Sequence, residues 1–142
     1  MRALIDTCII IDALQSRAPF KDSAEAIFLH AANRNFDGFI TAKSSTDIYY
    51  LTHRITHNDA DTRKILSNLF LLFIPLDTLG LDCRKALSSD ISDYEDGVMI
   101  ETALRSGIDC IVTRNTKDYA KSPVTVYQPE DFLLLLKSNS ED

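Results

Sequence analysis

Short apolar runs alternate with segments of helical period along almost the whole chain, and this alternation limits the possible folds more than any other feature. In the segment 21–34, for example, Ala24, Ile27 and Ala31 recur at helical spacing. Strands that alternate with helices are typical of a parallel sheet covered on both faces. We therefore expect an α/β protein, a three-layer α/β/α sandwich with a central parallel sheet.

Proline, glycine and the apolar runs set the expected elements. Pro75 favours an edge or a bulge for its strand, because proline cannot donate a ladder hydrogen bond. Gly107 is expected to end the late helix, Pro129 to begin the last one, and 35–38 to form a turn. The predicted strands are 2–5, 39–41, 73–77, 109–113 and 124–127, and the predicted helices are 8–15, 21–34, 42–55, 58–73, 81–89, 93–107 and 129–137.

The length of 142 residues suits one domain. We expect that domain over 1–136, followed by a polar C-terminal tail over 137–142. No apolar run approaches the roughly 20 residues of a membrane span, and no secretory signal is visible at the start. The three cysteines, Cys8, Cys83 and Cys110, favour free thiols in a reducing compartment. These features predict a cytoplasmic protein without a membrane partner.

The formal net charge of −6 argues against a large basic footprint for nucleic acid. It does not exclude a nuclease, because an acidic metal pocket concentrates several negative charges in one place. We expect any nucleic-acid binding to be local or helped by a partner.

Acidic residues lie where a parallel sheet would bring them together. Asp6 stops the first apolar run, Asp96 lies on the late helix, and Asp118 follows the fourth predicted strand. In open α/β sheets, ligands bind outside the carboxyl ends of the strands. Converging carboxylates repel one another unless a cation neutralises them. The pattern therefore indicates a divalent metal site and phosphate chemistry.

Several of these acids also have ordinary structural explanations. Asp6 can be a metal ligand or the cap of the helix that follows it, and position alone does not decide between the two. Asp93, Glu95 and Asp96 suit the first turn of a helix, where carboxylates stabilise the macrodipole. Asp96 is singled out because it lies on the helix face that turns toward the apolar core.

Other polar residues are weaker candidates. Arg114 can pair with a phosphate, although its segment also suits a turn. Asp47 can be a capping or surface residue of its helix, and Asp12 is expected on a solvated face. Arg54 can face a phosphate backbone, with a plain exposed face as the favoured alternative.

The helix predicted over 42–55 carries side chains that fit two interpretations. Tyr49 and Tyr50 can stack on bases, although one of them is needed for packing. His53 and His57 are spaced to bind metal, but a solvated helix end is favoured because no acid lies between them in the required pattern. The apolar run in the last helix is expected in the core or at a dimer or partner contact.

Taken together, four segments resemble the PIN domain, a small α/β ribonuclease module. The segments are LIDTCIIIDAL, ITAKSSTDIYYL, SDYEDGVMIETALRSGIDCIVTRNTKDY and the closing strand with PEDFL, and their order and spacing fit almost the whole chain. The resemblance implies cleavage of RNA that depends on Mg²⁺ or Mn²⁺. Many bacterial members are toxins of VapBC-type toxin–antitoxin pairs, so it also implies an antitoxin protein as partner, and a homodimer.

The resemblance assigns site residues one position at a time. Asp6 matches the first acid of the family, Asp96 the acid on the late helix, and Asp118 lies in the last polar segment. These three are the expected metal ligands, directly or through water, and Asp47 falls where active toxins usually have Glu. We expect all four carboxylates to be catalytic.

The remaining candidates support these four carboxylates, and two positions depart from the family pattern. Asp47 is one methylene shorter than Glu, and Asn115 is neutral where many members have Asp. The supporting residues are Thr7, Asp93, Thr113 and Asn115, and the candidate RNA contacts are Arg114 and Arg54.

Our leading hypothesis is a metal-dependent endoribonuclease, the toxin of a type II toxin–antitoxin pair. The two departures motivate an alternative, a PIN-like module that binds RNA or protein but cuts poorly. A receiver-like or phosphatase-like domain is disfavoured, because VTVYQPE lacks the expected lysine and DTCII lacks a second Asp.

Overall fold

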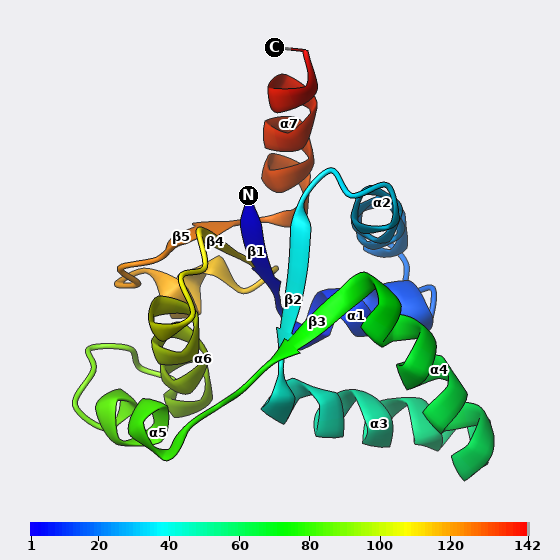
Figure 1. Cartoon of the computed structure of the whole chain (residues 1–142), viewed down its shortest axis with the longest axis horizontal. Helices are drawn as coiled ribbons and strands as arrows, with labels where there is room; N and C mark the ends of the chain where they lie inside the picture. The colour runs from blue at the N-terminus through cyan, green and yellow to red at the C-terminus, as the bar shows by residue number, and fades with distance from the viewer. Residues whose placement is uncertain (142) are drawn as a thin grey trace.

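The computed structural model describes residues 1–141 and consists of one five-stranded sheet with helices on both sides (Figure 1). The strands are β1 (Arg2–Ile5), β2 (Asp37–Thr41), β3 (Phe73–Leu76), β4 (Cys110–Val112) and β5 (Thr125–Tyr127). The helices are α1 (Thr7–Leu14), α2 (Lys21–Ala32), α3 (Ala42–Thr56), α4 (Asp59–Leu72), α5 (Gly80–Ala86), α6 (Tyr94–Arg105) and α7 (Pro129–Ser140), with a 3₁₀ helix, η1 (Thr116–Tyr119). No helix among these residues is long and apolar enough to cross a membrane.

All neighbouring strands are parallel, and their order is β3-β2-β1-β4-β5. The chain moves outward from β1 to β3 and then returns to pair β4 with the other side of β1. The order therefore reverses between β1 and β4, the point at which open α/β sheets bind their ligands. The predicted three-layer α/β/α architecture is confirmed.

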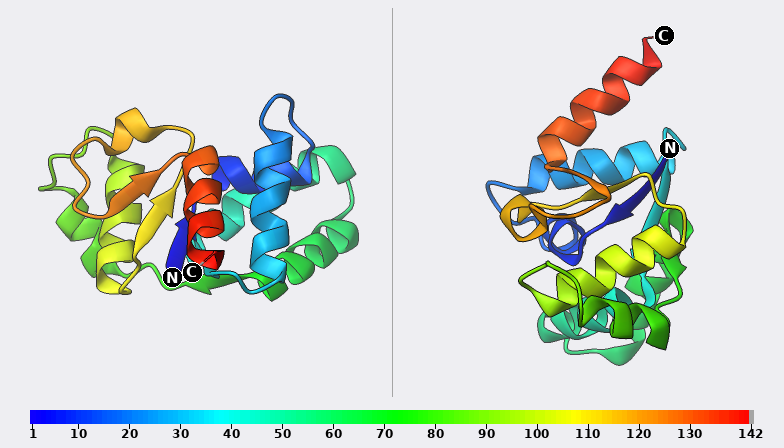
Figure 2. Two further views of the ribbon diagram at one scale, coloured as in Figure 1. Left: turned by 90° about the horizontal axis from the view of Figure 1, so that it is seen from above. Right: turned by 90° about the vertical axis from the view of Figure 1, so that its left-hand side faces the viewer.

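Alternation along β1 divides the core between the two faces of the sheet. Ala3 and Ile5 pack with α1, α2 and α7 on one face, whereas Leu4 packs with α6 on the other. Both views in Figure 2 show the sheet between these two helical layers. Residues 3–5 are fully buried, as expected for a central parallel strand.

The turn predicted over 35–38 is wrong in its second half, because β2 already begins at Asp37. The reason lies in the packing at Gly38. A Cβ atom on Gly38 would come within 2.6 Å of the Phe73 ring on β3. The glycine is therefore needed for close packing inside a strand rather than for a turn. Pro75 lies on β3, which is an edge strand as predicted.

The last helix is longer than the predicted 129–137. It continues to Ser140, into the segment expected to be a polar tail, because no Gly or Pro interrupts it. Phe132 and Leu136 belong to the core, whereas Leu134 is 65% exposed. α7 projects from the body of the protein (Figures 1 and 2).

Candidate active site

Asp6 directly follows β1 and occupies the N-cap position of α1, yet its side chain makes no capping hydrogen bond. Its Oδ2 instead accepts a hydrogen bond from Thr113 Oγ1 at 2.7 Å and lies 3.5 Å from Cys8 Sγ. The Asp6 side chain therefore does not cap α1, and its carboxylate is held against the end of β4 instead.

Thr113 follows β4, the neighbour of β1, and is completely buried. Its Oγ1 accepts a hydrogen bond from the backbone N–H of Asn115 at 3.1 Å. Because the Thr113 hydroxyl acts as an acceptor in that bond, the single proton of the hydroxyl can be donated to Asp6. Thr113 thus fixes the orientation of the Asp6 carboxylate across the point where the strand order reverses.

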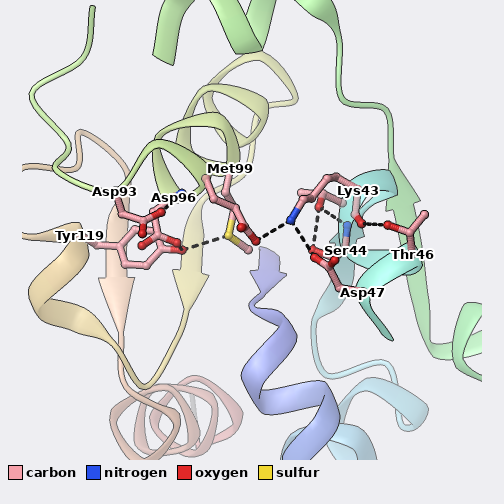
Figure 3. A network of polar contacts seen from close by, with 10 residues as sticks. Lys43, Ser44, Thr46, Asp47, Asp93, Asp96, Met99 and Tyr119 are labelled. Atoms are coloured by element: carbon pink, nitrogen blue, oxygen red, sulfur yellow. Dashed lines mark hydrogen bonds and ion pairs between the residues drawn. The ribbon is translucent and has the colours of Figure 1, made fainter. Parts of the chain in front are cut away.

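Asp96 lies in the first turn of α6, and Asp93 caps that helix. Asp93 Oδ1 accepts the Asp96 backbone N–H at 3.0 Å, so the capping explanation holds for Asp93. The Asp96 carboxylate points elsewhere and accepts a hydrogen bond from the Tyr119 hydroxyl at 2.9 Å (Figure 3). Tyr119 is 2% exposed and also contacts Met99 Sδ at 3.1 Å. Its ring is fixed by the core, and it positions Asp96.

Asp6 and Asp96 line one pocket of about 290 Å³ at the carboxyl ends of the strands. Thr7, Lys43 and Glu95 also line it. The rest of its wall comes from the β2–α3 junction and from the segment around α5 and α6, at Thr41, Ser44, Thr78, Cys83, Tyr94, Val98 and Met99. The predicted convergence of the first acid and the late-helix acid is therefore seen in the geometry.

The charged forms of Asp6 and Asp96 are electrostatically unfavourable in this pocket. Burial raises the pKa of Asp6, against the opposing hydrogen bond from Thr113. Burial also raises the pKa of Asp96 to about 6, and the negative charges of Asp93, Asp6 and Asp118 act in the same direction. Burial between these carboxylates raises the pKa of Tyr119 as well. Such a pair is stabilised by a bound cation.

Asp47 lies beside this pocket rather than in it. Its Oδ2 forms an ion pair with Lys43 Nζ at 2.8 Å, and Lys43 also contacts Glu95 Oε1 at 2.6 Å (Figure 3). Lys43 therefore links α3 to α6 at the edge of the pocket. A second hollow contains Asp47 and shares Thr7, Lys43 and Glu95 with the first.

The polar segment after β4 contributes to the acidic pocket less directly than the sequence indicates. Asn115 and Asp118 are both exposed, and neither lines the pocket. Asn115 contacts the site through its backbone N–H, and Asp118 acts on Asp96 through its charge.

The expectation that Asp12 lies on a solvated face is wrong. Asp12 is 1% exposed and forms an ion pair with Arg114, with Oδ2 2.7 Å from Nε. The Arg114 guanidinium also lies 3.9 Å from the centre of the Phe20 ring. Arg114 thus holds the loop after β4 against α1, which differs from the expected role as a free phosphate contact. The other candidate contact, Arg54, is exposed and lines the second hollow.

The donor set fits a divalent cation that keeps part of its water shell. No three side chains of His, Cys, Asp or Glu within residues 1–141 are grouped closely enough to hold an ion by themselves. Mg²⁺ is commonly bound through one or two carboxylates, with water and substrate phosphates completing the shell. Asp6 and Asp96 supply two carboxylates in one pocket, and burial, which raises the pKa of both, disfavours their charged forms unless a cation is bound.

Sequence reasoning missed three residues of the site. Lys43 has a local signal, its i, i+4 spacing to Asp47. Glu95 belongs to the acidic segment that the sequence singles out, but its contact with Lys43 across the pocket edge has no sequence signal. Tyr119 has no sequence signal, because its contact with Asp96 spans 23 residues.

Solved structures with the same fold include a toxin–antitoxin complex and two VapBC proteins. A toxin–antitoxin complex from Klebsiella pneumoniae aligns with a TM-score of 0.65 and 23% identity over 89% of this chain and 97% of the other. VapBC-1 from nontypeable Haemophilus influenzae aligns with a TM-score of 0.66 and 14% identity over 92% and 99% of the two chains. VapBC2 from Rickettsia felis, bound to a DNA fragment from its promoter, aligns with a TM-score of 0.62 and 14% identity over 90% and 98%.

At these identities the structural likeness establishes the fold, and the family follows from the sequence. No curated protein matches the chain by sequence. The sequence pattern that defines the PIN domain matches residues 2–117, which includes Asp6, Asp47 and Asp96 as well as the strand end at Thr113. The chain therefore belongs to the PIN domain family.

Proposed function

We propose that the protein is a metal-dependent endoribonuclease and the toxin of a toxin–antitoxin pair. The observation that carries this proposal is the pairing of Asp6 with Asp96 in one pocket where the strand order reverses. Membership of the PIN domain family supports nuclease activity, and the toxin–antitoxin complexes of similar fold support the biological role.

In this proposal Asp6 and Asp96 hold Mg²⁺ or Mn²⁺, and Asp118 and Asp47 complete the shell through water. The bound ion would make its water more acidic and neutralise charge on the phosphate. Carboxylate oxygens are the ligands that these hard cations prefer.

The chain's own residues prepare this pocket. Thr113 and Tyr119 each donate a hydrogen bond to one carboxylate, which keeps both acids aimed at a common space. Thr7 lines the same pocket and is placed to position a phosphate or a water. Asn115 fixes the Thr113 hydroxyl through its backbone N–H, so that the Asp6 orientation does not depend on the Asn115 side chain.

The direct test is cleavage of a mixed RNA pool by purified protein with Mn²⁺, Mg²⁺ or EDTA, beside Asp6→Asn. We expect cleavage that requires metal and disappears in the variant, while the variant keeps its fold by circular dichroism. Full activity of Asp6→Asn would contradict the site assignment, and activity unaffected by EDTA would contradict the metal dependence.

A second candidate function is a PIN-like module that binds RNA or protein without cutting. The ion pairs of Lys43 with Asp47 and Glu95 favour it, because they leave fewer carboxylates for a metal. A ligand that binds only the native state must stabilise it. An unchanged melting temperature across a Mg²⁺ and Mn²⁺ titration would therefore favour this second function.

The proposed partners are RNA, an antitoxin protein and a second copy of the chain, in the cytoplasm. A large apolar side chain, Leu134 on α7, is 65% exposed beside a hollow between α2 and α7, and such a surface suits a protein contact. Size-exclusion chromatography with light scattering, before and after Leu134→Glu, tests the homodimer.

A further inference from the structure

We propose that the outer face of α3 binds the single-stranded RNA that flanks the scissile phosphate. We call this surface the flank site and define it by Tyr49, Tyr50, His53 and Arg54 on α3 and by Arg63 on the neighbouring α4. The proposal rests on the proposed nuclease function for the identity of the ligand, and it names where the uncut part of the strand lies.

The flank site is continuous with the acidic pocket. Thr7, Lys43 and Glu95 line both that pocket and the second hollow, which also contains Tyr50 and Arg54. Tyr50 in turn lines a third hollow of about 760 Å³ between α3 and α4. A strand with one phosphate beside Asp6 and Asp96 would therefore pass the Lys43–Glu95 ion pair at the edge of the pocket and continue along α3.

The spacing along α3 gives this path its direction. Lys43, Asp47, Tyr50 and Arg54 follow one another at intervals of four, three and four residues, so they form a stripe on one helix face. From Lys43 to Arg54 the helix rises by about 16 Å. At about 3.4 Å for each stacked nucleotide, that length matches roughly four to five bases.

One exposed aromatic ring on this stripe, Tyr50, supplies a stacking surface, and two half-buried rings lie beside it. Tyr50 is 65% exposed, and its ring meets Tyr49 edge to face at 5.4 Å between centres. Tyr49 stacks on His53 at 5.7 Å with an angle of 16° between the rings, and its hydroxyl is bound by Asp59. The three rings therefore hold one another in place, with the Tyr50 face open to solvent. Such rings bind bases with little sequence preference.

The charges around the flank site favour stacking over phosphate binding as the main source of affinity. Lys43 is paired with Asp47 and Glu95, and Arg63 is paired with Asp59 at 2.8 Å. Arg54 makes no ion pair within residues 1–141 and is the cation available to a phosphate. A single uncompensated cation predicts a weak dependence of RNA affinity on salt.

The test measures binding of a labelled oligouridylate of about 12 nucleotides by fluorescence anisotropy in EDTA, so that cleavage does not interfere. Tyr50→Ala removes the exposed ring, and Tyr50→Phe keeps the ring but not the hydroxyl. Leu87→Ala is the control, since Leu87, just after α5, is also a large exposed side chain (76%) and lies outside the flank site and the α7 surface. We expect Tyr50→Ala to weaken binding about tenfold. Tyr50→Phe and Leu87→Ala should bind like the unmodified protein.

The outcomes separate this inference from the nuclease proposal. RNA cleavage by the unmodified protein, together with unchanged RNA affinity in Tyr50→Ala, would overturn the flank site and leave the nuclease intact. Loss of affinity in Tyr50→Ala, without cleavage under any metal, would support the flank site and overturn the nuclease. If Tyr50→Ala instead changes only the oligomeric state or the binding of a protein, the surface is a protein interface and the inference is wrong.

Discussion

The Thr113 hydroxyl donates a 2.7 Å hydrogen bond to Asp6 Oδ2, and this contact joins the ends of β4 and β1. The two residues are 107 positions apart in the chain, yet their strands are neighbours. Their contact lies at the one place where the strand order reverses. It is therefore a link between the topology of the sheet and the orientation of a proposed metal ligand.

Thr113→Val tests whether activity needs the hydrogen bond that orients Asp6 or only the volume of the side chain at position 113. Valine has nearly the same volume, but it removes the donor to Asp6 and the acceptor for the Asn115 N–H. Loss of such an orienting partner typically lowers metal affinity or activity by about 10- to 100-fold. We expect that loss in kcat/KM for RNA cleavage, with a higher concentration of Mn²⁺ at half-maximal rate. Thr113→Ser keeps the hydroxyl and should restore most of the activity; equal activity of the Val and Ser variants would show that the hydrogen bond is not needed.

Asp96→Asn should stabilise the metal-free protein at neutral pH. The pKa of Asp96 is raised to about 6, mainly by burial, so folding disfavours its charged form. Its contribution to stability is fully present below the unfolded pKa, near 4, and is lost as the pH rises through about 6. Asn carries no charge at either pH. The variant should therefore gain on the order of 1 kcal/mol over the unmodified protein at pH 7, after allowance for solvent screening of this partly exposed group.

The measurement is urea unfolding in EDTA between pH 4.5 and 8. The difference in stability between Asp96→Asn and the unmodified protein should grow as the pH rises through about 6 and then level off. A constant difference would mean that Asp96 is not destabilised by its charge. Added Mn²⁺ should stabilise the unmodified protein and have less effect on the variant.

Much of the fold follows from periodicity, because periodicity reports which side of an element is buried. The strand predicted over 2–5 is found at Arg2–Ile5, and the strand predicted over 73–77 ends one residue earlier. The parallel sheet and the two helical layers follow from the same alternation. The local sequence predicts a turn at Gly38, but the residue lies in a strand. A glycine is needed there because the Phe73 ring on another strand packs against it, and local sequence does not reveal that contact.

The candidate site was predictable in part. Position at a strand end indicated Asp6, and the apolar side of α6 indicated Asp96. The donors that orient them, Thr113 and Tyr119, depend on contacts across 107 and 23 residues. The sequence wrongly predicts a solvated face for Asp12, because its partner, Arg114, is 102 residues away. A sequence pattern shows that a charge is present but not whether the fold will bury it beside a partner.

Arg114→Met should destabilise the protein rather than weaken RNA binding. It leaves Asp12, which is 1% exposed, without the cation that compensates its charge. Removal of one partner from a buried ion pair costs about 3–5 kcal/mol, and the partial exposure of Arg114 places this case near the lower value. Urea unfolding should show this loss, and the double variant Asp12→Leu with Arg114→Met should recover part of it. A variant of unchanged stability with a raised KM for RNA would instead support the phosphate contact expected from the sequence.

Lys43→Met should increase the affinity of the proposed site for a divalent cation. Lys43 lies 2.8 Å from Asp47 and 2.6 Å from Glu95, and all three residues lie around the acidic pocket or the hollow beside it. Its positive charge opposes a metal ion directly and also holds two carboxylates that would otherwise attract one. Removal of one cation near a doubly charged ion amounts to about 1 kcal/mol in water, which is a few-fold in affinity. The exposed ion pairs themselves contribute little to folding, so the metal-free stability should change by less than about 1 kcal/mol.

The rise in melting temperature with Mn²⁺ concentration measures this affinity without requiring activity. Lys137→Met, on the exposed surface of α7, removes the same charge away from the site and serves as the control. We expect Lys43→Met to reach its half-maximal stabilisation at a few-fold lower Mn²⁺ concentration than either the control or the unmodified protein. Equal or weaker Mn²⁺ binding in Lys43→Met would mean that Asp47 and Glu95 do not contribute to the metal site even when they are released. In that case Asp6 and Asp96 act without help from α3, and the shorter side chain of Asp47 would not explain a weak nuclease.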